Sequence, residues 1–242
     1  MASEDHDFEE INHFTVEGQT SHWSNKSEGP VGRMSTEGLD RVLKTWKRHL
    51  GKRPHVKELQ ELFEQSYCKH SNLADATRFL VHQLFGSYGL VIVDGDDPQL
   101  KKQFAPYVQK ECEEQLIKTT SELIMKRLEK AFQKKMKPQV NTRNVNLFYM
   151  GGSSRQRITK TKDGYNVVQT KVSFTKKEFV AALQKHPERF SPNALLRPIF
   201  QEVVLPNLVY VGGGSELAYW LQLGEAFLSF DLPLPMLKLR SS

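Results

Sequence analysis

The residues best suited to chemistry stand together near the start of the chain, in the segment SEDHDFEEINHF at positions 3–14. If this segment is helical, His6, Glu10 and His13 fall at i, i+4 and i+7 on one face. A carboxylate between two imidazoles can bind a divalent metal, or can hold one histidine in the tautomer that accepts a proton. A solvated acidic helix start is the third interpretation, and the spacing alone leaves all three open.

A second polar cluster follows a short apolar run. Residues 89–93 form an uninterrupted apolar run that is rich in β-branched side chains, which is typical of a strand buried on both faces of a parallel sheet. Asp94 would then stand beyond the carboxyl end of that strand, where ligands bind in open α/β sheets. The alternative is a polar turn in which Asp97, before Pro98, caps the following helix. The pattern predicts the strand and leaves both roles open.

Three glycines connect a predicted strand to a predicted helix near the end of the chain. The strand is expected over residues 208–211, and the helix is expected to open at Ser215. Glycines at such a turn let the backbone approach a ligand, and a helix N-terminus favours an anion. The pattern is neither a P-loop nor GxGxxG. The alternative is a tight turn with Ser215 as N-cap and Glu216 complementing the helix dipole.

The elements that must position these residues mix helical and strand patterns. Apolar residues spaced by three to four positions predict one long helix over about residues 106–137. Asp163-Gly164 between two polar, β-prone runs predicts a hairpin over about residues 155–172. Thr175 is expected to cap a further helix. This mixture indicates an α/β fold.

Composition narrows the class of protein. The 242 residues are 38% apolar and 26% charged, which is ordinary for a globular chain. No apolar run reaches the roughly 18 residues of a membrane span, and no leader pattern opens the sequence. Cys68 and Cys112 are too few and too isolated for a disulfide framework or a zinc cluster. We therefore expect a protein of the reducing cytoplasm, without a membrane partner.

The net charge of +6 raises the question of a nucleic-acid partner. Much of the positive charge lies in residues 126–137 and 155–177. These residues have amphipathic spacing and lack the aromatic platform on which single-stranded nucleic acids stack. We interpret them as solvated faces and expect no nucleic-acid partner.

Three blocks of sequence carry a resemblance to a known family: SEDHDFEEINHF, GPVGRM, and FSPNALLRPIFQEVVLPNLVYVGGGSELAYWLQL. They resemble the BshC family of bacillithiol biosynthesis, and the resemblance covers essentially the whole chain. It implies a Rossmann-like core with helical and β-hairpin connecting insertions, of which residues 1–242 form a single region. Because the family extends beyond both ends, we expect an internal fragment that lacks the family's C-terminal coiled coil.

The resemblance also implies a function. Members of the family are thought to be cytoplasmic ligases that add L-cysteine to the amine of glucosaminyl malate, forming the amide bond of bacillithiol. By analogy we expect activation of the cysteine carboxylate, with ATP as co-substrate, no tightly bound cofactor, and a homodimer. The alternative is a truncated, non-catalytic fragment that keeps the fold and binds small anionic or amino-sugar ligands.

Residue roles follow from the positions that match. The resemblance implies proton handling and binding of the substrate ammonium or hydroxyl groups by the opening motif, through Asp5, His6, Asp7, Asn12 and His13. Substrate or nucleotide contacts are expected from Asp94, Arg197, Gln201, Asn207, Gly212, Gly213, Gly214 and Glu216. We expect no metal ligands and no tightly bound zinc.

Overall fold

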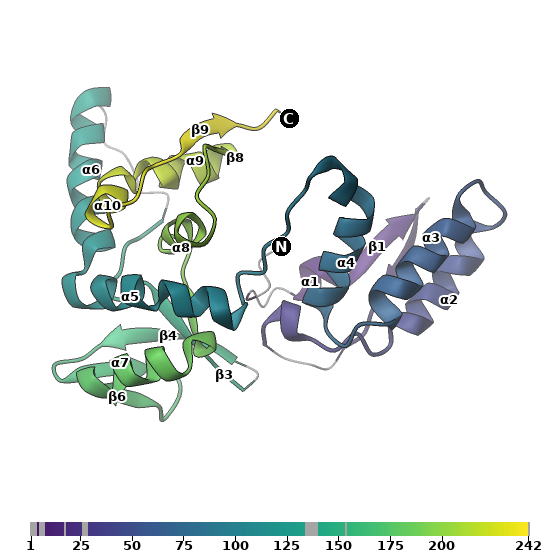
Figure 1. The fold of residues 1–242 in the computed structure, drawn as a ribbon, viewed down its shortest axis with the longest axis horizontal. Coiled ribbons are helices and arrows are strands. Elements are labelled where there is room, and N and C mark those ends of the chain that lie inside the picture. Colours follow the sequence, from purple (N-terminus) through teal and green to yellow (C-terminus); the bar gives the residue numbers. More distant parts are fainter. Residues whose placement is uncertain are drawn as a thin grey trace. The chain divides into compact units, whose positions relative to one another are not determined.

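The computed structural model describes residues 4, 8–16, 18–25, 29–133, 140–152 and 154–241. The chain divides into two compact units. Unit 1 comprises residues 1–96 with 151–155, and unit 2 comprises residues 97–150 with 156–242. Figure 1 shows the elements of both units as a ribbon. Each unit has its own buried apolar cluster, while the expected single region over 1–242 stays a prediction.

Unit 1 consists of helices and one short hairpin. The hairpin pairs two antiparallel strands, and Gly18 at its turn has a φ of 76°. The elements in chain order are α1 (Phe8–Ile11), β1 (His13–Val16), β2 (Gln19–His22), η1 (Val31–Arg33), α2 (Leu39–Leu50), α3 (Val56–Phe63), the π-helical η2 (Glu64–Cys68), α4 (Leu73–Phe85) and η3 (Gly86–Tyr88).

Trp23 anchors the opening segment to the core of unit 1. Its ring lies 5.3 Å from the ring of Phe8, centroid to centroid, and its Nε1 donates to the carbonyl of Glu37 at 3.0 Å. Its backbone N–H donates to the carbonyl of Asn12 at 2.7 Å. Because Trp23 is buried, these contacts hold α1 and β1 against the segment that leads into α2.

The helical interpretation of the opening motif, in which Glu10 and His13 share one face, is wrong over the described part of the motif. Glu10 lies in α1, which ends at Ile11, whereas His13 begins β1. In β1 the side chains of Phe14 and Val16 are half-buried, while those of His13 and Thr15 are exposed. This alternation has the period of a strand, and it outweighs the helical spacing of the charged residues.

The strand expected over residues 89–93 is also wrong. This segment has no regular secondary structure, and Val91 is 72% exposed. A strand of a parallel sheet needs at least one partner strand for its backbone hydrogen bonds, and the described residues supply none there. The alternative is confirmed, because the side chain of Asp97 accepts hydrogen bonds from the N–H groups of Gln99 and Leu100 at the start of α5 (Pro98–Glu114).

Unit 2 combines a sheet of five described strands with helices and a separate parallel strand pair. The sheet has the order β6-β5-β4-β3-β7. The elements that follow α5 are α6 (Leu116–Phe132), β3 (Leu147–Gly151), β4 (Ser154–Lys160), β5 (Gly164–Val167), β6 (Ser173–Thr175), α7 (Lys176–Lys185), η4 (Pro187–Arg189), β7 (Phe190–Pro192), α8 (Arg197–Val204), β8 (Val209–Gly212), α9 (Gly214–Leu221), α10 (Gly224–Ser229) and β9 (Met236–Leu239).

Two local predictions for unit 2 are confirmed. The hairpin expected over about 155–172 is formed by β4 and β5, which pair antiparallel with Ile158 opposite Val167. Thr175 caps α7, and Glu178 completes the capping box by accepting from the N–H of Thr175 at 2.8 Å. The ring of Phe179 then packs on Tyr165 of β5, with 4.2 Å between centroids, so α7 covers this part of the sheet.

The single long helix expected over about 106–137 is wrong. Helices α5 and α6 are separated at Gln115, whose φ of 55° is left-handed. The carboxylate of Glu111 accepts the N–H of Ile117 at 3.0 Å, so a side chain satisfies a donor that a continuous helix would pair with a carbonyl. Both Cys112 and Ile117 are fully buried, and the break lets each face the core.

The strand and helix expected around the three glycines are confirmed within one residue. Strand β8 runs into Gly212, and α9 begins at Gly214 with Gly213 as its N-cap in place of Ser215. After α10 the chain returns to β9, which pairs with β8 in parallel. This β-α-β connection is the building unit of Rossmann-like folds. No helix among the described residues is long and apolar enough to cross a membrane.

Candidate functional site

The carboxyl ends of the parallel strands β8 and β9 meet at the glycine turn of unit 2. The backbone N–H of Arg240, just after β9, donates to the carbonyl of Gly212 at 3.0 Å. The carboxyl ends of parallel strands are where ligands bind in open α/β sheets. The turn that the sequence singled out therefore lies at the edge where the fold favours a site.

Glu216 fixes the conformation of this turn. Its Oε2 accepts the N–H of Gly213 at 2.8 Å, and its Oε1 accepts the hydroxyl of Tyr210 at 3.0 Å. The hydrogen bond from Gly213 is the main cause that lowers the pKa of Glu216. Desolvation, with the bond to Glu216, raises the pKa of Tyr210 to about 12. At neutral pH the turn thus holds a carboxylate and a neutral phenol.

The three glycines differ in what they permit. A Cβ on Gly212 would lie 2.7 Å from Cε1 of Tyr210, whose ring stacks on Trp220 with 4.0 Å between centroids. A Cβ on Gly214 would meet nothing within 4 Å. None of the three has a positive φ. Gly212 is therefore needed for space beside Tyr210, while the open face at Gly214 is free for a ligand to approach.

Two arginines add positive charge at this edge. Arg197, at the start of α8, and Arg240 both lower the pKa of Glu216 through their charges. The Nη2 atom of Arg240 would lie 3.5 Å from a Cβ on Gly213. Guanidinium groups bind carboxylates and phosphates well. Arg197 was expected here, whereas Arg240 was missed, although its place directly after an apolar strand pattern could have indicated it.

The other two predicted residues of this region surround a different carboxylate. Glu202 is fully buried, and it accepts the backbone N–H and the Nδ2 of Asn207, both at 2.8 Å. Gln201 donates its Nε2 to the same carboxylate at 3.2 Å. Gln201 and Asn207 thus supply hydrogen bonds to a buried carboxyl group and hold the loop between α8 and β8. Their expected role as ligand contacts stays a prediction.

In unit 1, Asn12 and His13 are neighbours at the start of the hairpin. The Nδ1 of His13 lies 3.0 Å from the Oδ1 of Asn12, and its ring is 5.5 Å from that of His22, its partner across the strand pair. Because an amide oxygen only accepts, this contact is a hydrogen bond in the tautomer of His13 that carries its proton on Nδ1 and has Nε2 as the acceptor. The other opening residues, Asp5, His6 and Asp7, lie outside the described residues.

Asp94 belongs to a turn braced by an ion pair. Its Oδ1 accepts the N–H of Asp96 at 2.9 Å, and Asp96 forms a two-pronged pair with Arg33, with Nη2 to Oδ1 at 2.8 Å. Bidentate pairs of this kind fix geometry as well as charge. Arg33 stands in the block GPVGRM, so this ion pair connects that block to the turn at residues 94–96, about 60 residues later in the sequence. The expected ligand role of Asp94 stays a prediction.

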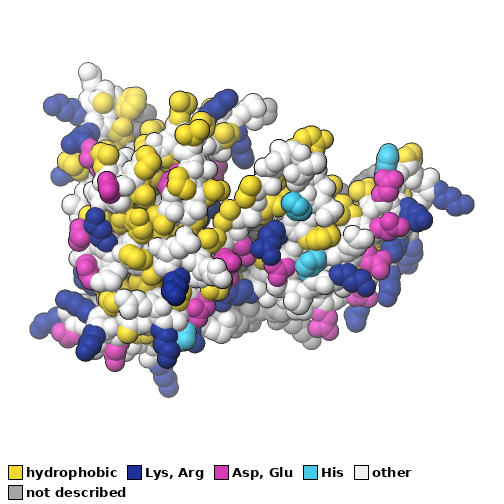
Figure 2. Space-filling model, viewed as in Figure 1, with side chains coloured by type: hydrophobic (Ala, Val, Ile, Leu, Met, Phe, Trp, Pro, Cys, Tyr) yellow, Lys and Arg dark blue, Asp and Glu magenta, His cyan; other side chains and the backbone are white. Residues whose placement is uncertain are grey.

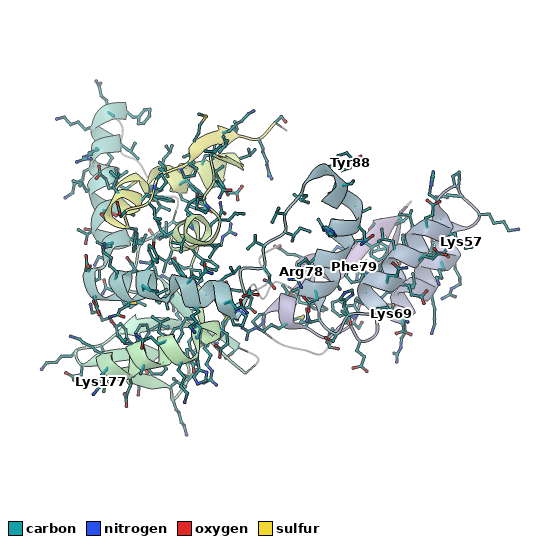
Figure 3. The ribbon with its side chains drawn as sticks, in the orientation of Figure 1. Lys57, Lys69, Arg78, Phe79, Tyr88 and Lys177 are labelled. Carbon is teal, nitrogen blue, oxygen red and sulfur yellow. The ribbon has the colours of Figure 1, made fainter. Side chains whose placement is uncertain are left out.

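A groove of about 650 Å³ on α4 contains none of the predicted site residues. Figure 3 labels Arg78 and Phe79, which come from this helix. Arg78 pairs with Asp75 at 2.7 Å, and the ring of Phe79 packs on His70 with 5.1 Å between centroids. The remaining lining residues are His82, Leu90, Val91 and Ile92. The polar side chains Asp75 and Arg78 of this lining pair with each other, so the groove indicates no specific ligand.

Within the described ranges, no group of three or more His, Cys, Asp or Glu side chains could hold a metal ion. His6 is outside those ranges. The expectation of a metal-free protein therefore stays a prediction.

The chain matches the family described as "Bacillithiol biosynthesis BshC, N-terminal Rossmann-like domain" over residues 1–241. It is 48% identical over 242 residues to a protein of Flavobacterium johnsoniae named "Putative cysteine ligase BshC", covering 100% of this chain and 45% of that protein. A Staphylococcus aureus protein of the same name is 28% identical over 98% of this chain and 46% of its own length. The chain thus spans less than half the length of these relatives.

Proposed function

We propose a ligase function for this chain, starting from the fact that it belongs to the BshC family of bacillithiol biosynthesis, whose N-terminal Rossmann-like domain matches residues 1–241. That match carries the proposal. The reaction is the addition of L-cysteine to the amine of glucosaminyl malate, which forms bacillithiol. The chain spans 45% of its relative from Flavobacterium johnsoniae, so the reaction of the whole enzyme is a proposal for this chain.

The reaction requires activation of a carboxyl group. An oxygen of the cysteine carboxylate attacks a phosphorus atom of ATP, the co-substrate, and a P–O bond of ATP breaks to release ADP or pyrophosphate. The product is an activated carboxyl derivative with a phosphate-containing leaving group. The amine nitrogen of glucosaminyl malate then attacks the carbonyl carbon, the amide bond forms, and the leaving group departs with its electron pair. The attacking nitrogen gives up one proton, so the reaction needs an anion-binding group and a base. The candidate for each lies in a different unit of the chain.

The edge at the ends of β8 and β9 suits the anion-binding part. Two guanidinium groups, those of Arg197 and Arg240, act on the same turn, and Gly214 leaves its backbone open to approach. Glu216 already accepts the N–H of Gly213, so an anion would bind to the arginines rather than to the helix N-terminus. A substrate carboxylate or phosphate matches this arrangement.

The opening motif suits the base. The contact with the Oδ1 of Asn12 suits the tautomer of His13 in which Nε2 accepts a proton, and the ring is exposed. The proposed role of His13 is to take the proton from the attacking amine. His22 offers a matched control, because it is an exposed imidazole directly across the same strand pair.

The test uses a chimera in which residues 1–242 replace the matching part of the Flavobacterium johnsoniae relative. Mass spectrometry follows bacillithiol formation from L-cysteine and glucosaminyl malate, with and without ATP, for the chimera and for the chain alone. We expect ATP-dependent product from the chimera. Absence of product from both proteins, under conditions where the intact relative is active, overturns the proposal.

Variants of the chimera test the residue roles. We expect His13→Gln to lower the rate at least about 100-fold, which is typical for the loss of a general base, while His22→Gln changes it only a few-fold. Arg240→Gln is expected to raise the KM for an anionic substrate with a smaller effect on kcat. Equal effects of the two histidine substitutions would remove His13 from the mechanism.

A further inference from the structure

Two histidines face each other across the hairpin of unit 1. His13 of β1 is the register partner of His22 of β2, and both side chains are exposed. Their rings lie 5.5 Å apart, centroid to centroid, with 32° between the ring planes. Neutral imidazole is the commonest protein ligand of zinc and its neighbours among the transition metals, so two of them at this distance raise the question of a shared ion.

The position of the histidines in the strand ladder brings their side chains close together. The backbone N–H of Trp23 donates to the carbonyl of Asn12 at 2.7 Å, so the pair of residues next to the histidines is a hydrogen-bonded pair. Hydrogen-bonded and non-hydrogen-bonded pairs alternate along an antiparallel ladder. His13 and His22 are therefore a non-hydrogen-bonded pair, the kind in which opposite side chains approach most closely.

The histidines share the solvent-exposed face of the hairpin with a second polar pair. Residues two apart in a strand lie on one face, so Thr15 and Thr20 are beside the histidines, and their hydroxyl oxygens are 2.8 Å apart. The opposite face carries Phe14, which packs against the core cluster of unit 1. The core thus fixes the hairpin from one side, while water reaches the imidazoles from the other.

The separation of the two rings fits one shared ion. Zinc binds an imidazole nitrogen at about 2.0–2.1 Å, which puts the ion about 3.2 Å from the ring centroid. Two imidazoles at the tetrahedral angle around such an ion have centroids about 5.2 Å apart. The observed 5.5 Å is close to this value. The strands therefore already stand at the right separation, and only the exposed side chains have to turn toward the ion.

Asn12 supplies the support that metal-binding histidines usually have. The Nδ1 of His13 lies 3.0 Å from the Oδ1 of Asn12. A histidine that binds a metal through one ring nitrogen typically donates the N–H of the other to a carbonyl or carboxylate oxygen, which fixes the tautomer and orients the ring. In the tautomer that makes this hydrogen bond, Nε2 of His13 is the atom left to bind the ion.

We propose that His13 and His22 bind one divalent transition-metal ion of the zinc class, with water molecules as its remaining ligands. Mg²⁺ prefers oxygen ligands and does not suit this pair. Within the described ranges no third His, Cys, Asp or Glu joins the two histidines, so the ion exchanges with solvent, unlike a structural zinc with four protein ligands. Bound zinc takes the electron pair of Nε2 with which His13 is proposed to accept a proton, and this consequence alone rests on the proposed function.

The test measures Zn²⁺ binding to the 242-residue chain, purified without a histidine tag, by isothermal titration calorimetry, with Mg²⁺ as the counter-probe. We expect saturable binding of Zn²⁺ and none of Mg²⁺. His13→Gln and His22→Gln should each weaken Zn²⁺ binding about tenfold or more, because either one leaves a single imidazole. The double substitution should weaken it far less than the product of the two single effects, since the two residues share one ion.

His55→Gln is the matched control. His55 is an exposed imidazole whose Nδ1 lies 2.8 Å from a carboxylate oxygen of Glu58 rather than beside a second histidine, so the zinc affinity should stay unchanged. All three positions are exposed, so the variants should fold, which circular dichroism checks. The proposal is overturned if no saturable binding occurs up to about 1 mM Zn²⁺, or if either His13→Gln or His22→Gln leaves the affinity unchanged. The titration contains no substrates, so its result does not depend on ligase activity.

Discussion

Glu111, on α5, is fully buried, and its carboxyl group links α5 to α6. It accepts from Ile117 at the start of α6 and from Nδ2 of Asn146 at 2.8 Å. Asn193 donates to Oδ1 of Asn146 at 2.9 Å, and its own Oδ1 accepts two N–H groups just before α8. One side chain thus connects α5 to the start of α8 through two amides.

The protonation of Glu111 makes the stability of the chain depend on pH. Burial raises the pKa of Glu111 from 4.5 to about 7, despite hydrogen bonds from Ile117 and Asn146 that lower it. Between pH 4.5 and 7 the folded chain keeps a proton that the unfolded chain has released. We therefore expect the free energy of unfolding to fall by about 3 kcal/mol as pH rises through this window.

Urea unfolding at several pH values measures this dependence. Glu111→Gln should remove most of the slope between pH 4.5 and 7, because the amide stays neutral. Glu113→Gln is the control, since Glu113 is an exposed carboxylate on the same helix. An unchanged slope in Glu111→Gln would mean that other groups carry the pH dependence.

The glycine turn can be dissected with two matched substitutions. Gly212→Ala places a methyl group against Tyr210 and must displace the ring stack on Trp220. We expect a loss of about 1–3 kcal/mol in the free energy of unfolding. Gly214→Ala meets open space at a negative φ, so we expect stability unchanged or slightly increased.

Urea unfolding and near-ultraviolet circular dichroism measure both effects, since the dichroism reports the packing of the Tyr210 and Trp220 rings. If the two variants lose equal stability, the space beside Tyr210 is not the reason for a glycine at position 212.

Elements that depend on neighbouring residues could be predicted from the sequence, and elements that depend on distant partners could not. The cap of α7 at Thr175 and the hairpin of β4 and β5 need only a few adjacent residues. The break at Gln115 needs Glu111 and the core around Ile117. The strand expected at residues 89–93 needs partner strands that the described residues do not provide.

In the candidate site, too, residues marked by a local sequence pattern could be predicted, and residues placed by distant contacts could not. Glu216 was predicted as a residue of the turn, because an acidic residue in the first turn of a helix is a local signal. Arg240 was missed, because only the pairing of β9 with β8 brings it to Gly212. Gln201 and Asn207 were predicted as ligand contacts, but their contacts are with Glu202, whose burial no local pattern indicated.

As a whole molecule, the chain exposes much apolar surface near its end. Figure 2 shows hydrophobic side chains on the visible face over the last helices and strands of unit 2. The exposed large apolar residues of the parallel pair are Val209, Val211, Met236 and Leu239. An exposed strand edge with apolar side chains favours pairing with other chains.

We therefore expect the chain to self-associate as its concentration rises, which sedimentation velocity measures. Val211, 57% exposed on β8, is the test position, and Val211→Lys should reduce association because charge blocks edge pairing. Leu123 is 45% exposed but helical, so Leu123→Lys should have little effect. Equal effects of the two substitutions would assign the association to general hydrophobicity.

The parallel pair of β8 and β9 has a further consequence for the life of the chain in a cell. Among the described residues β8 and β9 pair only with each other, so each has an edge that no described strand covers, as in a chain still emerging from the ribosome. Chaperones and proteases recognise such surfaces. The abundance of this chain should then depend on how quickly its edges are shielded, as much as on its free energy of unfolding.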